Sequence, residues 1–202
     1  MLVKTMHLGR FMTNCHILTD ETTRECAVID PSGECNKIMN YIEDNKLTCK
    51  MILVSHGHFD HTGAVEDLHR ETGAAVYMHG EEVKKNMLEL AKFAPPPGTE
   101  MIKEGDKLSL GSLTIEVMET PGHSPGSLTF RCGTALFTGD TLFRDSIGRT
   151  DLPGANGRAM LESLKRLATL PGDFDVYPGH MDNTTLERER RSNMFIRQAM
   201  DA

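Results

Sequence analysis

The chain has 202 residues, of which 39% are hydrophobic and 25% are charged, and its formal net charge is −7. A globular protein of this size can bury a sizeable core, and we expect one domain spanning residues 1–202. The negative charge argues against nucleic acid or an anionic membrane as the main partner. No apolar run approaches the roughly 20 residues of a membrane-spanning helix. Composition says nothing about the oligomeric state.

The cysteines indicate a reducing compartment. There are five of them, an odd number, and no two form a C-x-x-C pair. This pattern favours reduced thiols over a disulfide framework or a zinc knuckle. The first 20 residues also lack the long apolar stretch of a secretory signal. We therefore expect a cytoplasmic protein.

Apolar strands and amphipathic helices follow one another in two groups along the chain. The continuous apolar run at 50–55 is typical of a strand that is buried on both faces. Gly73 is placed to end one helix and the prolines at 95–97 to end the next. We expect strands within residues 1–30 and at 50–55, 74–79, 107–120, 127–133, 134–139 and 173–179, and helices at 31–47, 63–73, 81–93, 157–169 and 184–200.

This order of elements predicts an α+β fold. Each group of strands is accompanied by helices, and amphipathic elements must bury their apolar faces against one another. Two sheets packed face to face, with the helices outside, satisfy that requirement. The result is a four-layer sandwich.

Residues that can bind metal ions gather where predicted strands end. The stretch "SHGHFDH" at 55–61 directly follows an apolar strand, and three further strands each end at a histidine or an aspartate. A rigid sheet can aim groups from distant parts of the sequence at one point, which is why active sites lie at strand ends. The candidate ligands are His56, His58, Asp60, His61, His123, Asp140 and His180.

The spacing of these residues has chemical content. His56 and His58 are two positions apart, so in an extended segment both point to the same side and can reach one metal ion. Asp60 and His61 project differently and can serve a second ion. A carboxylate such as Asp140 can bridge two ions about 3.5–4 Å apart. We expect two divalent ions, with zinc first and iron or manganese as alternatives, because such ligands accept all three.

Other polar residues have simpler explanations. Four histidines lie outside the pattern and are expected to make ordinary structural hydrogen bonds. They are His7, His16, His69 and His79. Asp30 ends a predicted strand, where it either supports the metal site from behind or forms a local turn.

Together the motifs resemble the metallo-β-lactamase superfamily, whose signature is H-x-H-x-D-H followed by a distant His, Asp and His. Within it, four segments are similar to hydroxyacylglutathione hydrolases of the glyoxalase II type. These segments are "SHGHFDHTGAV", "TPGHSPGS", "LFTGDTLFRDSIGRTDLPG" and "VYPGH". The likeness is to the short bacterial type, without the C-terminal helical domain that grips glutathione. It implies an αββα sandwich of two mixed sheets, formed as one metallo-β-lactamase-fold domain over residues 1–202, with the metals at one edge between the sheets.

The resemblance also implies a role for each ligand. His56, His58 and His123 would hold the first metal ion, Asp60, His61 and His180 would hold the second, and Asp140 would bridge them. The implied reaction is hydrolysis of a hydroxyacyl thioester such as S-lactoylglutathione by a metal-bridging hydroxide. Asp60 would in addition act in catalysis, by orienting the hydroxide or moving protons.

Two arginines are candidates for contact with the substrate. Arg144 and Arg149 follow Asp140 closely and can hold an anionic carboxylate. A surface salt bridge or loop anchor explains Arg149 equally well and explains Arg144 better. The amphipathic segment 81–93 and the prolines after it suit either a flap over the cleft or ordinary core packing.

Three other functions compete with the thioesterase. A persulfide dioxygenase of the same superfamily would hold a single Fe(II) with His56, His123 and Asp140. A non-catalytic binding module would not need seven metal ligands. A lactamase is disfavoured because many zinc lactamases use a cysteine at the second metal, where this chain has Asp60, His61 and His180.

Overall fold

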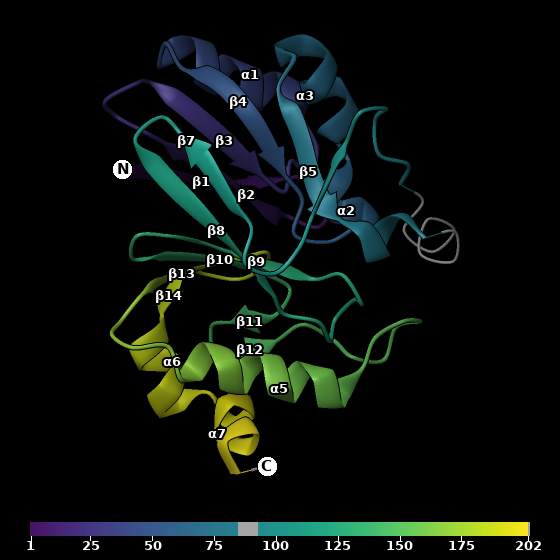
Figure 1. Ribbon diagram of the computed structural model, residues 1–202, viewed down its shortest axis with the longest axis vertical. Coiled ribbons are helices and arrows are strands. Elements are labelled where there is room, and N and C mark those ends of the chain that lie inside the picture. The colour runs from purple at the N-terminus through teal and green to yellow at the C-terminus, as the bar shows by residue number, and fades with distance from the viewer. Residues whose placement is uncertain (85–92, 202) are drawn as a thin grey trace.

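Two six-stranded sheets form the centre of the protein, and helices cover their outer faces (Figure 1). The computed structural model describes residues 1–84 and 93–201. The first sheet runs β1 (Leu2–Leu8), β2 (Thr13–Thr19), β3 (Glu25–Ile29), β4 (Thr48–Leu53), β5 (Ala75–His79), β6 (Glu100–Ile102). The second runs β14 (Thr184–Thr185), β13 (Asp175–Pro178), β10 (Ala135–Gly139), β9 (Leu128–Cys132), β8 (Leu113–Glu119), β7 (Lys107–Leu110).

Both sheets are mixed. In the first, β1–β3 pair antiparallel and β3–β6 pair parallel. In the second, the pair β10–β13 is parallel, and the other pairs are antiparallel. A small hairpin of β11 (Leu142–Phe143) and β12 (Ser146–Ile147) follows the second sheet's central strand β10.

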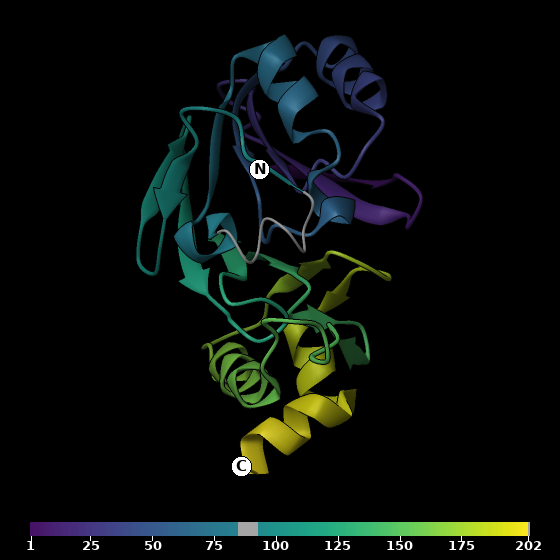
Figure 2. The ribbon, with the colours of Figure 1, turned by 90° about the vertical axis from the view of Figure 1, so that its right-hand side faces the viewer.

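The helices form the two outer layers (Figures 1 and 2). Helices α1 (Cys35–Asp44) and α3 (Val65–Thr72) cover the first sheet. Helices α5 (Gly157–Ala168), α6 (Leu186–Ser192) and α7 (Met194–Asp201) cover the second. The short helix α2 (Phe59–Thr62) follows β4, and the 3-10 helix η1 (Gly80–Val83) directly follows β5. The predicted αββα sandwich with two mixed sheets is therefore confirmed.

Three apolar cores join the four layers, and the strand pattern explains them. Successive side chains of a strand point to opposite faces. In β3, Cys26 and Val28 accordingly pack under the first pair of helices, whereas Ala27 and Ile29 pack between the sheets. The third core joins the second sheet to α5, α6 and α7. This burial on both faces explains the continuous apolar runs of the central strands.

The closing segment differs from its prediction. The sequence suggested one helix over 184–200, but the helix breaks at Asn193, whose ψ of 116° is not helical. The buried Asn193 amide donates to the carbonyl oxygens of Phe143 and Ser146, and its own oxygen accepts from the Phe195 N–H. These bonds compete with continuation of the helix and dock it against the β11–β12 hairpin.

Other differences are smaller. The short strands β6, β11, β12 and β14 carry too few residues to show an alternating pattern in the sequence. The helix and flap predicted from residue 81 onward fall largely on residues 85–92, outside the described residues.

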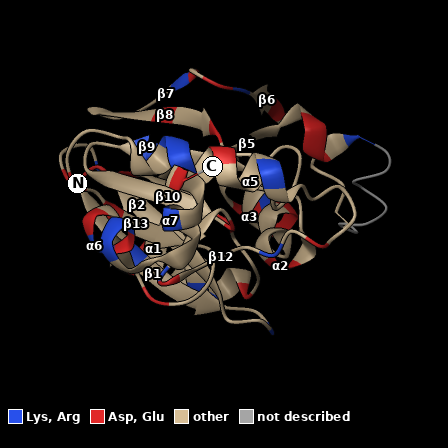
Figure 3. Ribbon diagram, turned by 90° about the horizontal axis from the view of Figure 1, so that it is seen from below, with Lys and Arg blue, Asp and Glu red and all other residues tan. Residues whose placement is uncertain are grey.

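Basic and acidic residues are interspersed over α5 and α6 (Figure 3). Within residues 1–84 and 93–201, no helix is long and apolar enough to cross a membrane.

Candidate metal centre

All seven predicted ligands lie in one cluster where the two sheets meet. The loop after β4 carries His56 and His58, and α2 carries Asp60 and His61. The second sheet contributes the other three from its strand ends: His123 after β8, Asp140 after β10 and His180 after β13. Each sheet therefore supplies part of the site, and the sandwich brings the parts together.

The first group consists of His56, His58 and His123, whose ligand atoms lie within 4.8 Å of one another. His58 Nδ1 is 2.9 Å from His123 Nε2. Two imidazole nitrogens bound to one tetrahedral zinc ion are separated by about 3.3 Å, given Zn–N bonds of about 2.0–2.1 Å. The group thus has the dimensions of a metal site.

The second group consists of Asp60, His61 and His180, which also lie within 4.8 Å of one another through one ligand atom each. His61 Nε2 and Asp60 Oδ2 are each 3.3 Å from His180 Nε2. The group combines two imidazoles with one carboxylate, a ligand set that suits several divalent transition metals.

Asp140 lies between the two groups. Its Oδ1 is 3.3 Å from His61 Nε2, and its Oδ2 is 3.5 Å from His123 Nε2 and 3.6 Å from His180 Nε2. One carboxylate thus reaches nitrogens of both groups.

Two buried atoms at the centre lack a hydrogen-bond partner among the described residues. They are His56 Nε2 and Asp140 Oδ1. Buried polar atoms are rarely left unpaired, because each costs free energy. A divalent cation would satisfy both, since imidazole nitrogen and carboxylate oxygen are its ligands. The cluster therefore fits a divalent metal ion.

Asp30 supports the cluster from behind. Its carboxylate accepts hydrogen bonds from the Ser55 N–H (2.7 Å) and hydroxyl (2.6 Å) and lies 3.0 Å from His61 Nδ1. A carboxylate on one ring nitrogen fixes the orientation of the other toward a metal. Asp30 has a φ of 51°, which residues other than glycine rarely adopt. Of the two expectations for Asp30, the structure favours the supporting role.

Two further histidines are held in the same way. His56 Nδ1 lies 3.0 Å from the Ser55 hydroxyl, and His123 Nδ1 donates to the Arg149 carbonyl oxygen at 2.8 Å. In each ring the second nitrogen is thereby directed at the cluster.

Burial and charge set the protonation of the ligands. Burial, with smaller contributions from His123 and His61, lowers the pKa of His58 to about 4, and burial also lowers the pKa of His56 well below 6.5. Both are neutral near pH 7, as metal coordination requires. For His61, burial is outweighed by the Asp140 and Asp30 carboxylates, which raise its pKa well above 6.5. Binding of a metal ion at His61 would therefore release a proton.

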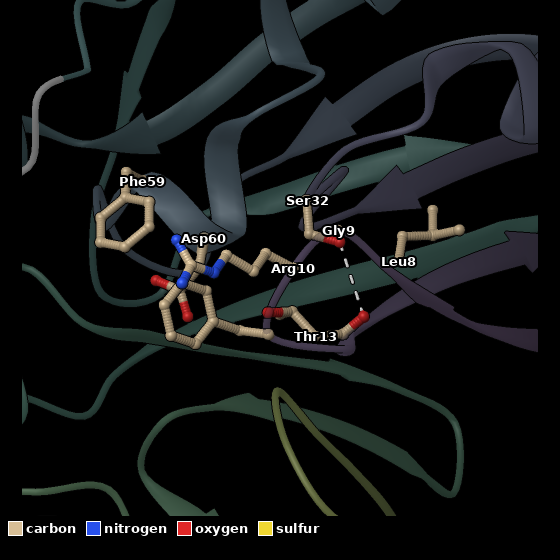
Figure 4. Close-up of a pocket in the computed structure, with 8 residues that line it drawn as sticks. Leu8, Gly9, Arg10, Thr13, Ser32, Phe59 and Asp60 are labelled. Atoms are coloured by element: carbon tan, nitrogen blue, oxygen red, sulfur yellow. Dashed lines mark hydrogen bonds between the residues drawn. The ribbon is translucent and has the colours of Figure 1, made fainter.

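A cleft of about 600 Å³ opens over the cluster. Its walls are mostly apolar, and Phe11 and Phe59 form an edge-to-face pair with ring centroids 5.5 Å apart. A smaller pocket of about 240 Å³ is lined by the same two rings and by Arg10 and Asp60 (Figure 4). The exposed rings thus stand at the mouth of both cavities.

The model of the family described as "Metallo-beta-lactamase superfamily" matches residues 8–180. The chain belongs to the metallo-β-lactamase superfamily. The matched range covers all seven clustered residues, from His56 to His180.

Curated relatives span the same length as this superfamily member. A probable metallo-hydrolase of Bacillus subtilis, YqgX, is 34% identical and is aligned over 96% of each chain. The hydroxyacylglutathione hydrolase GloC of Haemophilus influenzae is 32% identical, over 97% of this chain and 98% of that protein.

Solved structures agree with the fold. The BLEG-1 B3 metallo-β-lactamase has a TM-score of 0.88 at 32% identity, covering 96% of this chain and 99% of that one. TTHA1623 in a di-iron-bound form has a TM-score of 0.82 at 36% identity, covering 95% and 99%. ETHE1 from Myxococcus xanthus has a TM-score of 0.85 at 27% identity, covering 100% and 91%.

The two candidate substrate arginines are placed differently. Arg149 lines the cleft, but its guanidinium makes two hydrogen bonds to Asp151. Arg144 pairs with Asp182 and is not among the described lining residues of the cleft. Of the two, only Arg149 lies where a substrate would meet it, and contact with substrate stays a prediction for both.

Sequence reasoning missed two residues near the site. Arg10 lines the smaller pocket, and Glu82 is buried against the ligand loops. Neither belongs to a motif, so only the folded structure reveals them. The four histidines outside the pattern make hydrogen bonds elsewhere, as expected. The partners are Asn14 for His7, Thr5 and Pro178 for His16, Ala74 for His69, and Glu119 for His79.

Proposed function

We propose that this protein is a dinuclear metal-dependent thioesterase that hydrolyses hydroxyacyl thioesters such as S-lactoylglutathione. The observation that carries the proposal is the pair of ligand groups joined by Asp140. His56, His58 and His123 would hold one divalent ion, and Asp60, His61 and His180 the other. Zinc is the proposed metal, and the same ligands accept iron or manganese.

The chain's own groups support hydrolysis. When bound, the divalent ions would supply Lewis acidity, polarising the thioester carbonyl and lowering the pKa of water. Asp60 faces both cavities. Burial raises its pKa, but the hydrogen bond with His180 and the charge of His61 outweigh burial and lower the pKa below 3.8. Asp60 is thus ionised near pH 7 and can accept a proton from water or orient it.

The lining of the cleft favours a thioester over an amide. Apart from Arg149, every ionisable residue described in the lining is a proposed metal ligand. No separate general acid therefore stands among the described lining residues to protonate a leaving group. A thiolate departs without that help, whereas an amine does not. The substrate class that suits this cleft is one with a good leaving group.

The apolar walls suit the remaining parts of such a substrate. Phe11, Phe59, Phe143, Ile147 and Leu152 line the cleft together with Pro153. Ligand pockets of this kind combine apolar walls with a few placed polar groups. In our proposal Arg149 is one of those groups and contacts a substrate carboxylate by exchanging part of its pairing with Asp151.

A second candidate is a mononuclear iron persulfide dioxygenase. Two histidines and one carboxylate, His56, His123 and Asp140, lie together as the facial triad of non-haem iron enzymes does. The di-iron-bound form of TTHA1623 shows that a similar protein holds iron. The second group of Asp60, His61 and His180 is expected in both subfamilies, so our preference for the hydrolase rests on the four segments that resemble glyoxalase II enzymes and on the similarity to GloC.

Elemental analysis of freshly purified protein, combined with two assays, separates these candidates. The thioesterase predicts two metal ions per chain and release of thiol from S-lactoylglutathione. One iron per chain, with oxygen uptake on glutathione persulfide and no thioester turnover, would replace it with the dioxygenase. Turnover of nitrocefin above that of the thioester would replace it with a lactamase.

A variant links the activity to the first ligand group. His58→Ala should abolish thioester turnover and lower the metal content while the chain stays folded, because His58 is part of the cluster and not of an apolar core. His69→Ala is the matched control, since the His69 side chain bonds to the Ala74 carbonyl just past the end of α3 and is not part of the cluster. A wild-type rate in purified His58→Ala protein would contradict the assignment.

A further inference from the structure

Glu82 is a buried carboxylate outside the metal centre. It lies in η1, directly after β5, and only 1% of its surface is exposed. Its side-chain contacts within residues 1–84 and 93–201 are three hydrogen bonds, and none of them is to a lysine or an arginine. A buried carboxylate is costly unless its oxygens are well hydrogen-bonded. The hydrogen-bond partners of Glu82 should therefore show why a carboxylate is buried at this position.

These partners belong to two loops that carry metal ligands. Glu82 Oε2 accepts from the Gly57 N–H at 2.8 Å, and Gly57 separates His56 from His58. Glu82 Oε1 accepts from the Ser124 hydroxyl and from the Gly126 N–H, each at 2.8 Å. Ser124 follows His123 directly. One carboxylate thus ties together the loops of all three residues of the first ligand group.

We propose that Glu82 is a positioning residue of the metal centre, which holds the two loops at the separation that the first ligand group needs. The carboxylate does not touch the cluster. It acts through the chain just before His58 and just after His123, whose ring nitrogens lie 2.9 Å apart. The second group, on α2 and after β13, receives no bond from Glu82.

The neighbouring glycines fit this role. A Cβ atom at Gly126 would lie 2.8 Å from Glu82 Oε1 and 2.7 Å from His79 Nδ1. A Cβ at Gly57 would lie 3.1 Å from Glu82 Oε2. A side chain at Gly126 would force the carboxylate or His79 to shift, and one at Gly57 would crowd the carboxylate, so glycine at both positions favours the close approach of Glu82. Two motif glycines that bind no metal are thereby explained by the same clamp.

The element that carries Glu82 is itself anchored. His79 Nδ1 accepts from the Glu81 N–H at the start of η1, and His79 Nε2 lies 3.1 Å from Glu119 Oε1 on β8. Because η1 is fixed to both sheets in this way, it can set the distance between one loop of the first sheet and one loop of the second.

The test is zinc affinity, measured by competition with a chelator. Glu82→Gln keeps the shape but replaces one acceptor oxygen by an amide that donates. Whichever way the amide lies, a backbone N–H, of Gly57 or of Gly126, then loses its acceptor. Glu81→Gln is the matched control, because Glu81 is the adjacent glutamate, exposed and paired with Lys84.

The measurement is made in two backgrounds, which separate the groups. In His180→Ala the first group is left intact, and Glu82→Gln should weaken zinc binding by about 10- to 100-fold, the usual effect of removing a group that orients metal ligands. In His58→Ala the second group is left, and the change should stay within about twofold, since Glu82 does not bond to that group. Glu81→Gln should change neither affinity.

Ser124→Ala is a milder variant that keeps the test valid if Glu82→Gln fails to fold. It removes one of the three hydrogen bonds and leaves the carboxylate in place. It should weaken the first group by a smaller factor than Glu82→Gln. Equal losses in both backgrounds would overturn the proposal and reduce Glu82 to general support of the fold. Unchanged affinity in the His180→Ala background would overturn it as well.

The inference rests on the proposed metal centre but not on the proposed substrate. Zinc affinity is measured without a thioester, so failure of the thioesterase assay leaves this result standing. Absence of zinc binding by the wild-type chain would overturn the metal centre and the role of Glu82 together.

Discussion

The floor of the cleft, which is the histidine and aspartate cluster, is largely buried, whereas its rim, which carries Phe11 and Phe59, is exposed. On the floor, His56 and His61 are 1% and 0% exposed, and each has a second partner that fixes its ring. On the rim, Phe11 and Phe59 are 53% and 51% exposed. Their rings contact each other and line the cleft. The floor is a network of buried hydrogen bonds, whereas the rim consists of exposed side chains on the loop between β1 and β2 and at the start of α2.

This difference should separate metal binding and turnover, which depend on the floor, from the choice of substrate, which depends on the rim. A buried network holds its groups within narrow limits, so changes on the floor should alter metal binding and turnover number. Exposed loop residues can change with little effect on the fold, so changes on the rim should alter KM and the choice of substrate. A rim variant that alters metal binding, or a floor variant that alters only the choice of substrate, would show that floor and rim are coupled.

The largest effect is expected from Asp140→Ala on the floor. Asp140 reaches nitrogens of both groups, so both metal ions should be lost and thioester turnover should fall by about 1000-fold or more. His180→Ala should remove mainly one ion. Metal analysis of both purified variants checks this. Equal metal loss in the two would contradict a bridging position for Asp140.

The next effect concerns pH and His16, which is buried and whose Nε2 lies 3.0 Å from the Pro178 carbonyl oxygen. Burial lowers the pKa of His16 to about 4, below its ordinary value of 6.5. As the pH falls from 6.5 toward 4, the unfolded chain takes up this proton first, and stability is lost over that range by up to about 3 kcal/mol. Above pH 6.5 the contribution is constant.

His16→Gln checks this, because glutamine retains a donor for the Pro178 carbonyl and does not titrate. Urea unfolding of the metal-free proteins at pH 7.5 and 4.5 should show a smaller loss of stability in the variant. The same pH dependence in both proteins would show that other groups carry the effect.

A smaller loss is expected from Asp30→Asn. The amide removes the negative charge beside His61 and can keep the shape of the hydrogen-bonded network. Affinity for the ion held by the second group should fall about 10- to 100-fold. Chelator competition measures it, with the exposed Asp44→Asn on α1 as the control. If both variants bind metal equally well, Asp30 does not orient His61.

The smallest effect belongs to the rim. Arg149→Ala should raise KM by about 10-fold for a thioester that bears a carboxylate and leave KM of a neutral thioester unchanged. Metal content should not change, because the backbone carbonyl that holds His123 remains. Arg144→Ala, which changes a surface pair with Asp182, should have no effect. An effect of Arg144→Ala larger than that of Arg149→Ala would reverse the assignment.

The same division explains what the sequence could predict. The residues of the cluster could be predicted because metal binding demands particular residue types at short spacing, as in His56, His58, Asp60 and His61. The layers could be found because apolar alternation records burial. Asp30 was recognised only as one of two possibilities, because its contact with His61 is 31 residues away in sequence.

What could not be predicted depends on long-range contacts of single side chains. Glu82 meets Gly57 and Gly126 only in the folded chain, and no motif marks it. The break at Asn193 depends on carbonyl groups of the β11–β12 hairpin, which is itself too short to be recognised. Arg149 pairs with Asp151, which is only two residues away. The sequence alone could not show whether the Arg149 guanidinium forms this pair or binds a substrate carboxylate.

The division of ligands between the two sheets also has a consequence for synthesis of the protein on the ribosome. His61 and His180, whose ring nitrogens meet in the second group, are 119 residues apart in the chain. When the first histidines emerge, their partners from the second sheet do not yet exist. A nascent chain can therefore offer an ion only a partial, weak set of ligands, and full metal loading must await the folding of both sheets.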